Sequence, residues 1–248
     1  MRLTIVPPAT AALALAMVAL PASAGEWGGL FPSVGVTSDY RYQGVSNSDG
    51  HPAVQGNVHY WRPDGLYAGL FVSQVDFNDG STSFETDWYA GKTWDLDRGR
   101  TRLAAEAMYT AFPDNETWGP TYDFLQLKLA ARRQQGPLAL TATGSYVPQA
   151  SYGSGQAWRL EGGADYALNR NLTVKAQVGK RWIDRGSDRA YWSLGASLGV
   201  GGSPLWRDYV FELRFQDTDR GKRDCGYNPD ICGPALVGTV TVNLKPIL

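Results

Sequence analysis

The sequence has few of the residues from which metal sites and catalytic triads are usually built. Its 248 residues include only two histidines, two cysteines and three methionines, and the formal net charge is −1. A charge so close to zero provides no basic field to attract nucleic acid. After residue 24 the chain also lacks an apolar run near the ~20 residues that a membrane-spanning helix needs. By contrast, 29 glycines, nine tryptophans and thirteen tyrosines are present. We therefore expect neither a nucleic-acid partner nor a resident cofactor.

The N-terminus has the order of a cleavable secretory signal. Arg2 gives a short basic start, AALALAMVAL (11–20) is an apolar core, and the small residues ASA come just before Gly25. That order is typical of an exported chain cut after the small residues. A membrane anchor is the alternative, but this apolar core is much shorter than a spanning helix. We expect residues 1–24 to be removed, leaving 25–248 as a single domain of formal charge −2.

The mature chain alternates between apolar and polar residues in segments of about ten. In YDFLQLKLAARR, for example, Leu125 and Leu127 fall on one face, and Gln126 and Lys128 on the other. A period of two is the strand signature, because successive side chains point to opposite faces. The pattern predicts twelve strands, near 33–44, 53–62, 66–77, 83–95, 101–112, 121–133, 137–147, 156–168, 171–182, 190–200, 207–217 and 234–244.

The lengths of the strands and of their connections indicate a membrane barrel. A tilted strand that crosses a bilayer needs about 9–11 residues, against a mode near 5–6 in soluble sheets. Tight links such as RPDG and QQGP alternate with long ones such as PDNETWGP. Short periplasmic turns and longer extracellular loops are typical of outer-membrane barrels. In lipid every backbone group must pair internally, so spanning strands have to close. We expect an all-β, transmembrane antiparallel up-and-down barrel in the outer membrane of a Gram-negative bacterium, surrounded by outer-membrane lipid.

Tryptophan and tyrosine gather where the predicted strands end, as amphipathic rings do at the headgroup level. Those near the long loops are Tyr40, Tyr42, Tyr109, Tyr122, Tyr146, Trp158, Trp182 and Trp192, and those near the short turns are Tyr60, Tyr67, Trp94, Tyr166 and Tyr209. A soluble β-sandwich with an aromatic core is the alternative. That fold does not explain why one face of several strands is charged throughout while the other stays apolar between aromatic ends.

Both cysteines lie in the segment DCGYNPDIC, as Cys225 and Cys232. Two cysteines so close together in an exported chain predict a disulfide that closes one loop. A metal site is the alternative, but the segment between them contains no histidine and only Asp230 as a further ligand type.

The first predicted hairpin resembles the TorF family of porins of Gram-negative bacteria. The resemblance is carried by SDYRYQGVSNSDGHPAVQGNVHY and DGLYAGLFVSQVDF, and covers roughly residues 34–77. The positions that match the family pattern are Arg41, Tyr42, Gly44, Ser48, Asp49, Gly50, Pro52, Ala53, Gln55, Gly56, Gly65, Tyr67 and Gly69. The resemblance implies an outer-membrane β-barrel that acts as a passive channel, and it supplies no catalytic residues. The chain departs from such barrels at its last residues, VNLKPIL, where an aromatic residue usually serves the outer-membrane assembly machinery. Either the assembly machinery tolerates this change or the C-terminus has been altered.

If the apolar faces look outward, a set of charged residues lines the lumen. They are Asp39, Arg41, Arg102, Glu106, Lys128, Arg132, Arg159, Glu161, Asp165, Lys175, Arg181, Glu212 and Arg214. Basic residues outnumber acidic ones in this set, although Glu85 and Asp87, on the fourth predicted strand, would nearly balance them. An open lumen of this kind favours small polar solutes, with a preference for anions. A lumen plugged by ion pairs is an equal alternative, because twelve strands lie between filled eight-stranded barrels and sixteen-stranded porins.

Two other functions fit a barrel of this size. A lipid-modifying enzyme needs a serine activated by a histidine at the bilayer surface. The chain offers only His51, in a predicted loop, and His59, within a predicted strand, and no Ser-His-acid spacing stands out. A structural or adhesive barrel that acts through its six long loops is the third possibility. The sequence favours the channel.

Overall fold

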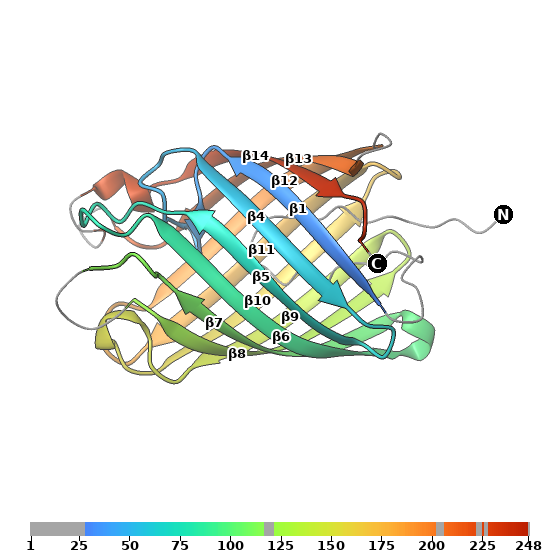
Figure 1. Ribbon diagram of the computed structural model, residues 1–248, viewed down its shortest axis with the longest axis horizontal. Helices are drawn as coiled ribbons and strands as arrows, with labels where there is room; N and C mark the ends of the chain where they lie inside the picture. Colours follow the sequence, from blue (N-terminus) through green and yellow to red (C-terminus); the bar gives the residue numbers. More distant parts are fainter. Residues whose placement is uncertain (1–27, 117–121, 202–205, 222–224, 226–227, 248) are drawn as a thin grey trace.

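The structure is a computed structural model, and it describes residues 28–116, 122–201, 206–221, 225 and 228–247. Within these residues, twelve antiparallel strands close into one barrel, and β1 pairs with β14 to seal it (Figure 1). The barrel strands are β1 (Gly29–Thr37), β4 (Ala53–Trp61), β5 (Leu66–Gln74), β6 (Phe84–Leu96), β7 (Thr101–Ala111), β8 (Phe124–Gln135), β9 (Leu138–Val147), β10 (Ala157–Ala167), β11 (Leu172–Ile183), β12 (Arg189–Gly201), β13 (Trp206–Thr218) and β14 (Ala235–Leu244).

The first predicted strand is the main correction to the strand assignments. The prediction ran from 33 to 44, but β1 ends at Thr37 and the chain then turns inward. Two short strands, β2 (Arg41–Tyr42) and β3 (Val45–Ser46), pair as a separate hairpin there. Between them Gln43 and Gly44 both have positive φ, 55° and 80°, as a tight two-residue hairpin turn requires. Residues 38–52, called the inner loop below, therefore leave the wall and lie inside the barrel.

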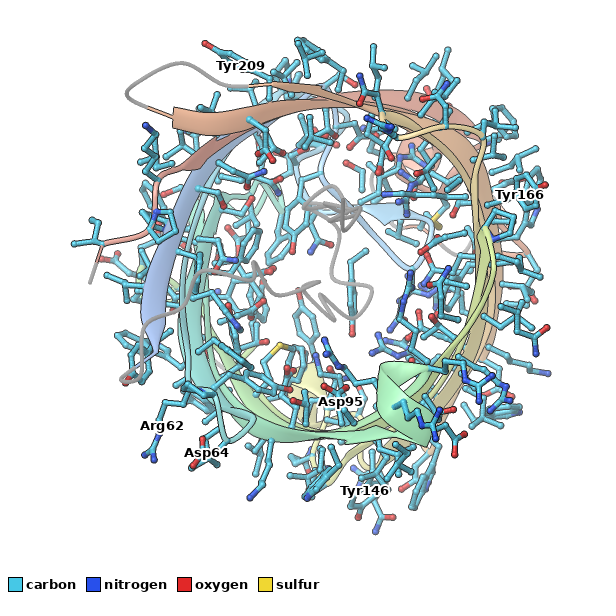
Figure 2. All side chains as sticks on the ribbon, turned by 90° about the vertical axis from the view of Figure 1, so that its right-hand side faces the viewer. Arg62, Asp64, Asp95, Tyr146, Tyr166 and Tyr209 are labelled. Carbon is cyan, nitrogen blue, oxygen red and sulfur yellow. A yellow bond between two sulfur atoms is a disulfide. The ribbon has the colours of Figure 1, made fainter. Side chains whose placement is uncertain are left out.

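The outer surface of the barrel is apolar. Leu129, Val178 and Leu236 are 68%, 61% and 63% exposed, although large apolar side chains are usually buried in soluble proteins. Viewed along the barrel, Tyr146, Tyr166 and Tyr209 stand on the outside of the wall, and Asp95 lies inside (Figure 2). The alternation read from the sequence thus sorts side chains into an apolar exterior and a polar interior. The described residues contain no helix with the length and hydrophobicity of a membrane span.

Four aromatic residues predicted at the headgroup level lie inside the barrel instead, among them Tyr67, whose hydroxyl donates to Glu106 at 3.0 Å. Tyr40 and Tyr122 are each 5% exposed and belong to a buried cluster with Phe112. Tyr42 accepts a hydrogen bond from Arg159 on the wall. For Tyr40, Tyr42 and Tyr122 the prediction was wrong because it assumed that the chain follows the wall up to residue 44 and from residue 121. Tyr67 does lie on the wall, in β5, but on its inward face.

Glycines on the inner face of the wall make room for tyrosines on neighbouring strands. A Cβ on Gly69 would lie 2.3 Å from the ring of Tyr89, and a Cβ on Gly91 would lie 2.5 Å from the hydroxyl of Tyr67. Gly69 and Tyr89 are direct cross-strand partners, as are Tyr67 and Gly91. The spacing of glycine and tyrosine in DGLYAG therefore reflects close ring-on-backbone packing inside the barrel.

Two further predictions concern the N-terminal signal and the cysteines. The predicted signal, residues 1–24, lies outside the described residues. The predicted disulfide between Cys225 and Cys232 is confirmed, and their Cα atoms are 6.1 Å apart.

Candidate functional site

The inner loop crosses the barrel and contacts several parts of its wall. On one side the Tyr40 hydroxyl donates to Glu85 of β6. On the other side Arg159 of β10 donates to the Tyr42 hydroxyl at 2.9 Å, and Arg189 of β12 donates to Gln43 at 3.0 Å. Because these strands lie far apart around the ring, the loop bridges the interior rather than lining one wall.

The β13–β14 connection holds the inner loop from the mouth. Arg41 donates to the carbonyl oxygen of Gly233 at 2.6 Å, and Asn228 donates to the carboxylate of Asp49. The disulfide closes this connection next to those contacts, because Cys232 immediately precedes Gly233. The inner loop is therefore fixed by contacts with residues almost 200 positions later in the chain.

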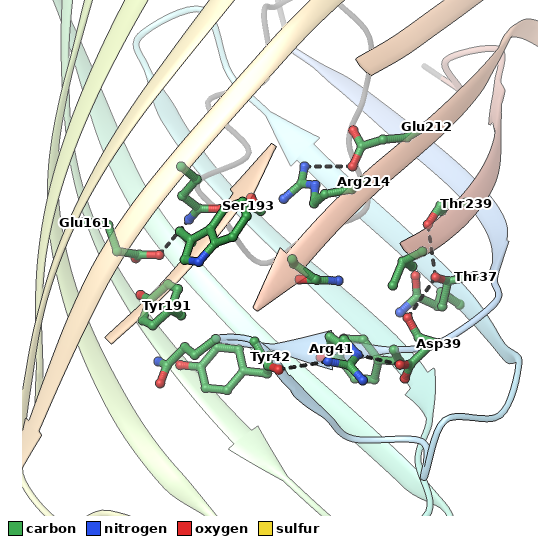
Figure 3. A pocket seen from close by; sticks show the side chains of 18 of the residues that line it. Thr37, Asp39, Arg41, Tyr42, Glu161, Tyr191, Ser193, Glu212, Arg214 and Thr239 are labelled. Atoms are coloured by element: carbon green, nitrogen blue, oxygen red, sulfur yellow. Dashed lines mark hydrogen bonds and ion pairs between the residues drawn. The ribbon is translucent and has the colours of Figure 1, made fainter. Parts of the chain in front are cut away.

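The inner loop separates two cavities. One, of about 380 Å³, is lined in part by residues of the long loops. The other, of about 70 Å³, lies on the other side of the hairpin and is drawn in Figure 3. Tyr42, Gln43 and Arg159 line both cavities. These three side chains therefore lie between the two cavities.

Most of the predicted lumen residues are brought together as ion pairs. Lys175 bonds Glu212 at 2.9 Å, and Arg214 bonds the same carboxylate at 2.7 Å. The other pairs are Arg41 with Asp39, Arg102 with Asp95, Lys128 with Glu106, Arg132 with Asp165 and Arg159 with Glu161. Of the thirteen predicted residues, Arg181 alone forms no ion pair within the described residues.

Arg181 belongs to a row of arginines that runs across neighbouring strands. In the register of the barrel Arg159 pairs with Arg181, and Arg181 pairs with Arg189. The row continues to Arg220, two residues beyond Thr218, the last residue of β13. Like charges directly opposite one another destabilise a sheet. We call Arg159, Arg181, Arg189 and Arg220 the arginine row.

Three arginines of the row have buried nitrogen atoms without partners. Among the described residues no hydrogen bond reaches the Nε atoms of Arg181, Arg189 and Arg220. All three side chains line the larger cavity, and Arg189 is only 5% exposed. Arg159 differs, because Glu161 neutralises it at 2.9 Å. Positive charge therefore accumulates on this part of the cavity wall.

The opposite part of the same cavity carries unpaired acceptors. Asp87 of β6 is 1% exposed and accepts from Thr110, but its second oxygen has no partner within the described residues. Gln126 of β8 is 2% exposed, and its side-chain oxygen is likewise unpartnered there. Glu85 adds a second carboxylate on β6. The cavity thus has a positive side and a negative side.

Sequence reasoning missed part of this site. Arg189 was placed just outside a strand that was predicted to begin at residue 190, although its odd number matches the inward residues Tyr191 and Ser193. Arg220 follows the last strand residue and carries no pattern of its own. Gln126 was placed on the polar face but carried no charge to single it out.

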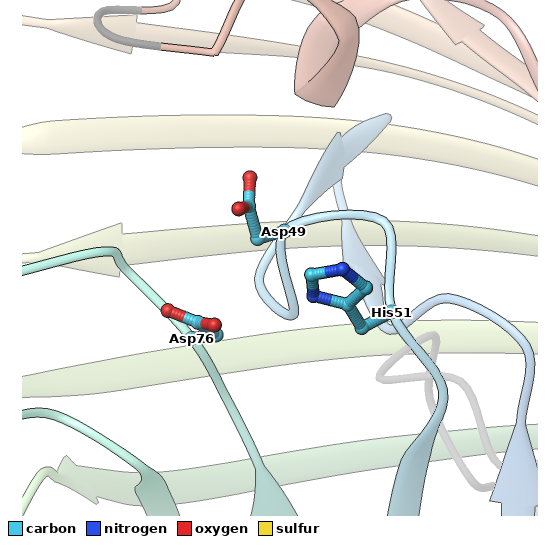
Figure 4. Close-up of side chains that lie close together, drawn as sticks. All are labelled: Asp49, His51 and Asp76. Carbon is cyan, nitrogen blue, oxygen red and sulfur yellow. The ribbon is translucent and has the colours of Figure 1, made fainter.

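Neither histidine lies in a catalytic arrangement within the described residues. His59 is 5% exposed and its ring contacts Tyr89, whose hydroxyl lies 3.2 Å from Nδ1, and Tyr67. His51 lies near Asp49 and Asp76, with their ligand atoms within 4.8 Å of one another (Figure 4). Exposed groups of this kind are common without a metal, so we assign this cluster no function.

Hydrogen bonds to the carboxylate of Asp79 order the long loop between β5 and β6. Asp79 accepts hydrogen bonds from the Thr82 hydroxyl and amide, the Ser81 amide and the Tyr122 hydroxyl. Partial burial alone would raise the pKa of Asp79, but these donors outweigh it and lower the pKa from 3.8 to about 2. The ionised carboxylate therefore stabilises this loop.

Comparisons with known proteins bear on the whole barrel. A family model described as "Bacterial protein of unknown function (Gcw_chp)" matches residues 26–228. No curated protein matches the sequence. Neither the family description nor the solved structures name the TorF family, so that resemblance stays a prediction.

Several solved barrels share the fold. A structure titled "KdgM porin" has a TM-score of 0.54 at 10% identity, over 87% of this chain and 98% of that one. A second structure of this porin, with a TM-score of 0.55, is titled as a complex with disordered oligogalacturonate. The COG4313 outer membrane channel from Pseudomonas putida F1 has a TM-score of 0.58 at 10% identity, over 92% of this chain and 99% of that one. At such low identity, the likeness shows the fold.

Proposed function

Because the chain belongs to the Gcw_chp family of bacterial proteins of unknown function, its activity has to be inferred from its own barrel, and we propose that it is a porin-like channel of the outer membrane. It lets small polar solutes diffuse passively across the membrane of a Gram-negative bacterium. The apolar outer surface supports a lipid environment, because lipid is the solvent that such a surface requires. The fold shared with the solved porin and channel structures supports the same environment.

The observation that carries the proposal is the charged interior with its two cavities on either side of the inner loop. A barrel with a purely structural role has no need for buried charges without partners, and each unsatisfied buried group costs about 1–3 kcal/mol. Rings of charged side chains select ions in pores. Since the unpartnered charges next to the inner loop are mainly arginines, the channel prefers anions to cations.

Conductance in planar bilayers tests the proposal. Purified full-length protein in a potassium chloride gradient should show discrete channels whose reversal potential indicates anion preference. A reversal potential of the opposite sign would refute the selectivity, and the absence of any conductance would refute the channel and favour a plugged or adhesive barrel. Liposome swelling with neutral, anionic and cationic solutes of graded size gives an independent measure of permeability.

The inner loop provides a matched variant. Replacing Tyr42 by alanine removes a ring between the two cavities and its hydrogen bond to Arg159, so single-channel conductance should rise. Replacing the outward-facing Tyr166, which is 47% exposed, by alanine should leave conductance unchanged. Equal conductance in both variants would show that the loop is not the narrow point of the pathway.

The enzyme alternative is tested separately. If the purified protein hydrolyses phospholipid, and His51→Ala or His59→Ala abolishes that activity, the channel is not the main function. The surroundings of both rings, described above, argue against this result.

A further inference from the structure

The larger cavity presents unsatisfied donors on one side and unsatisfied acceptors on the other. The donors are the Nε atoms of Arg181, Arg189 and Arg220, and the acceptors are one side-chain oxygen each of Asp87 and Gln126; none of the five has a partner in the part of the chain that the structure describes. Native proteins leave few buried polar groups unpaired, and the exceptions commonly mark a bound group or a functional role. Five in one cavity, sorted by sign, call for one explanation.

The two sides do not neutralise each other. Within the described residues no ion pair joins the arginine row to Glu85 or Asp87, and the carboxylate of Glu161 pairs with Arg159 alone. Like charges are instead held side by side, arginines in register on β11 and β12, and carboxylates two residues apart on β6. A single ion of either sign would relieve only one side.

We propose that this cavity binds a zwitterion, with its carboxylate held by Arg181, Arg189 and Arg220 and its ammonium group by Asp87 and Gln126. The chemical class is that of amino acids and short peptides. Guanidinium groups match carboxylates in geometry and hold them by charge-assisted hydrogen bonds. The assignment rests on the proposed channel, because it names the class of solute that the pathway takes.

The size and lining of the cavity agree with such a ligand. About 380 Å³ lies within the usual range for small-molecule sites and exceeds what one inorganic ion fills. Phe77, Phe112 and Tyr122 pack against one another toward the mouth of the cavity, with ring centroids 5.3–5.8 Å apart. They provide an apolar surface between the two charged sides and the long loops, against which the uncharged middle of a peptide can lie.

End-capped peptides test the charge requirement directly. Triglycine carries both charges, N-acetyl-triglycine only the negative one, and triglycinamide only the positive one. Titration calorimetry with the purified full-length protein in detergent should show saturable binding of triglycine, and each cap should weaken binding at least about tenfold, the loss of one charge-assisted contact. Equal affinity for triglycine and N-acetyl-triglycine would overturn the proposal in favour of a simple anion site.

Variants assign each end of the ligand. Arg181→Gln should weaken binding of triglycine and N-acetyl-triglycine but not of triglycinamide. Asp87→Asn should weaken binding of triglycine and triglycinamide but not of N-acetyl-triglycine. Arg133→Gln, at an exposed residue paired with Asp97, should change nothing. If Arg181→Gln or Asp87→Asn does not assemble, Arg220→Gln, outside the strands, and Gln126→Leu test the same two ends. A uniform loss of affinity for all three peptides in every variant would contradict the two-ended site.

Conductance distinguishes failure of this inference from failure of the proposed function. Channels without triglycine binding would overturn the zwitterion site and leave the channel standing. Triglycine binding without channels would overturn passive diffusion and leave a binding site in a closed barrel.

Discussion

Removing Arg181 should stabilise the barrel even though it removes a half-buried arginine. Its side chain has no hydrogen bond or ion pair within the described residues, and it lies in register between Arg159 and Arg189. Glu161 offsets the charge of Arg159, so the repulsion that matters comes from Arg189 and Arg220. Arg181→Gln keeps a polar, hydrogen-bonding side chain of similar reach and removes this repulsion.

The magnitude follows from the contacts. Two unit charges about 6 Å apart at an effective dielectric constant of about 20 repel by about 3 kcal/mol, and an unsatisfied buried nitrogen adds about 1 kcal/mol. Water in the cavity screens part of the repulsion, and the shorter side chain loses about 1 kcal/mol of packing. The free energy of unfolding should therefore rise by about 1–2 kcal/mol, which is about 2–8 °C in Tm for a chain of this length.

The measurement is thermal unfolding in detergent, followed by circular dichroism and by the heat-dependent shift in gel mobility. Lys175→Gln, on the same strand, is the control. Lys175 bonds Glu212 at 2.9 Å, with side-chain exposures of 11% and 9%, so its removal should lower Tm. If both variants lose stability equally, Arg181 has a structural partner and the like-charge argument is wrong.

Three further predictions concern the loops and the wall. Reduction of the disulfide between Cys225 and Cys232 should loosen the contacts that fix the inner loop, and channel recordings with and without reductant should show larger and noisier currents; unchanged currents would mean that those contacts hold without it. The ionised carboxylate of Asp79 stabilises the folded loop at pH values above its ordinary pKa of 3.8, and this stabilisation is lost as the pH falls through about 2. Protease cleavage of the loop should therefore increase between these pH values in wild type but not in Asp79→Asn. Gly179→Ala should lower the free energy of unfolding by about 1–3 kcal/mol, because the added carbon would lie 2.4 Å from the ring of Tyr191. A variant as stable as wild type in thermal unfolding would show that the ring can shift freely.

The wall of the barrel could be predicted from the sequence because alternation is a local property. For Leu125, Leu127 and Lys128, the position in the alternating pattern shows which face the side chain occupies, whatever lies across the barrel. The interior could not be predicted in the same way. Whether Tyr42 continues a strand or turns inward depends on Arg159, 117 positions away, and alternation is identical in the two cases until Gly44.

The candidate site shows the same limit. Arg159 and Arg181 were recognised as inward because each has polar neighbours at even spacing. Their register with Arg189 depends on how three strands pair, and pairing register is set by turn geometry and by the whole sheet. Arg220 lies beyond the last paired residue of β13, so no local pattern marks it. The division of the cavity into a positive and a negative side became visible only once the ring was closed.

The seam between β1 and β14 has a consequence for biogenesis. It joins residues about 200 positions apart, and contacts of such long range form slowly. Asn228 and Gly233, which clasp the inner loop, come immediately before β14. While the nascent barrel is still an open sheet, the β2–β3 hairpin therefore has to stay on its inner face, and the contacts with Asn228 and Gly233 form only when β14 pairs. Mutations that remove these contacts should accordingly slow maturation before they alter the finished protein.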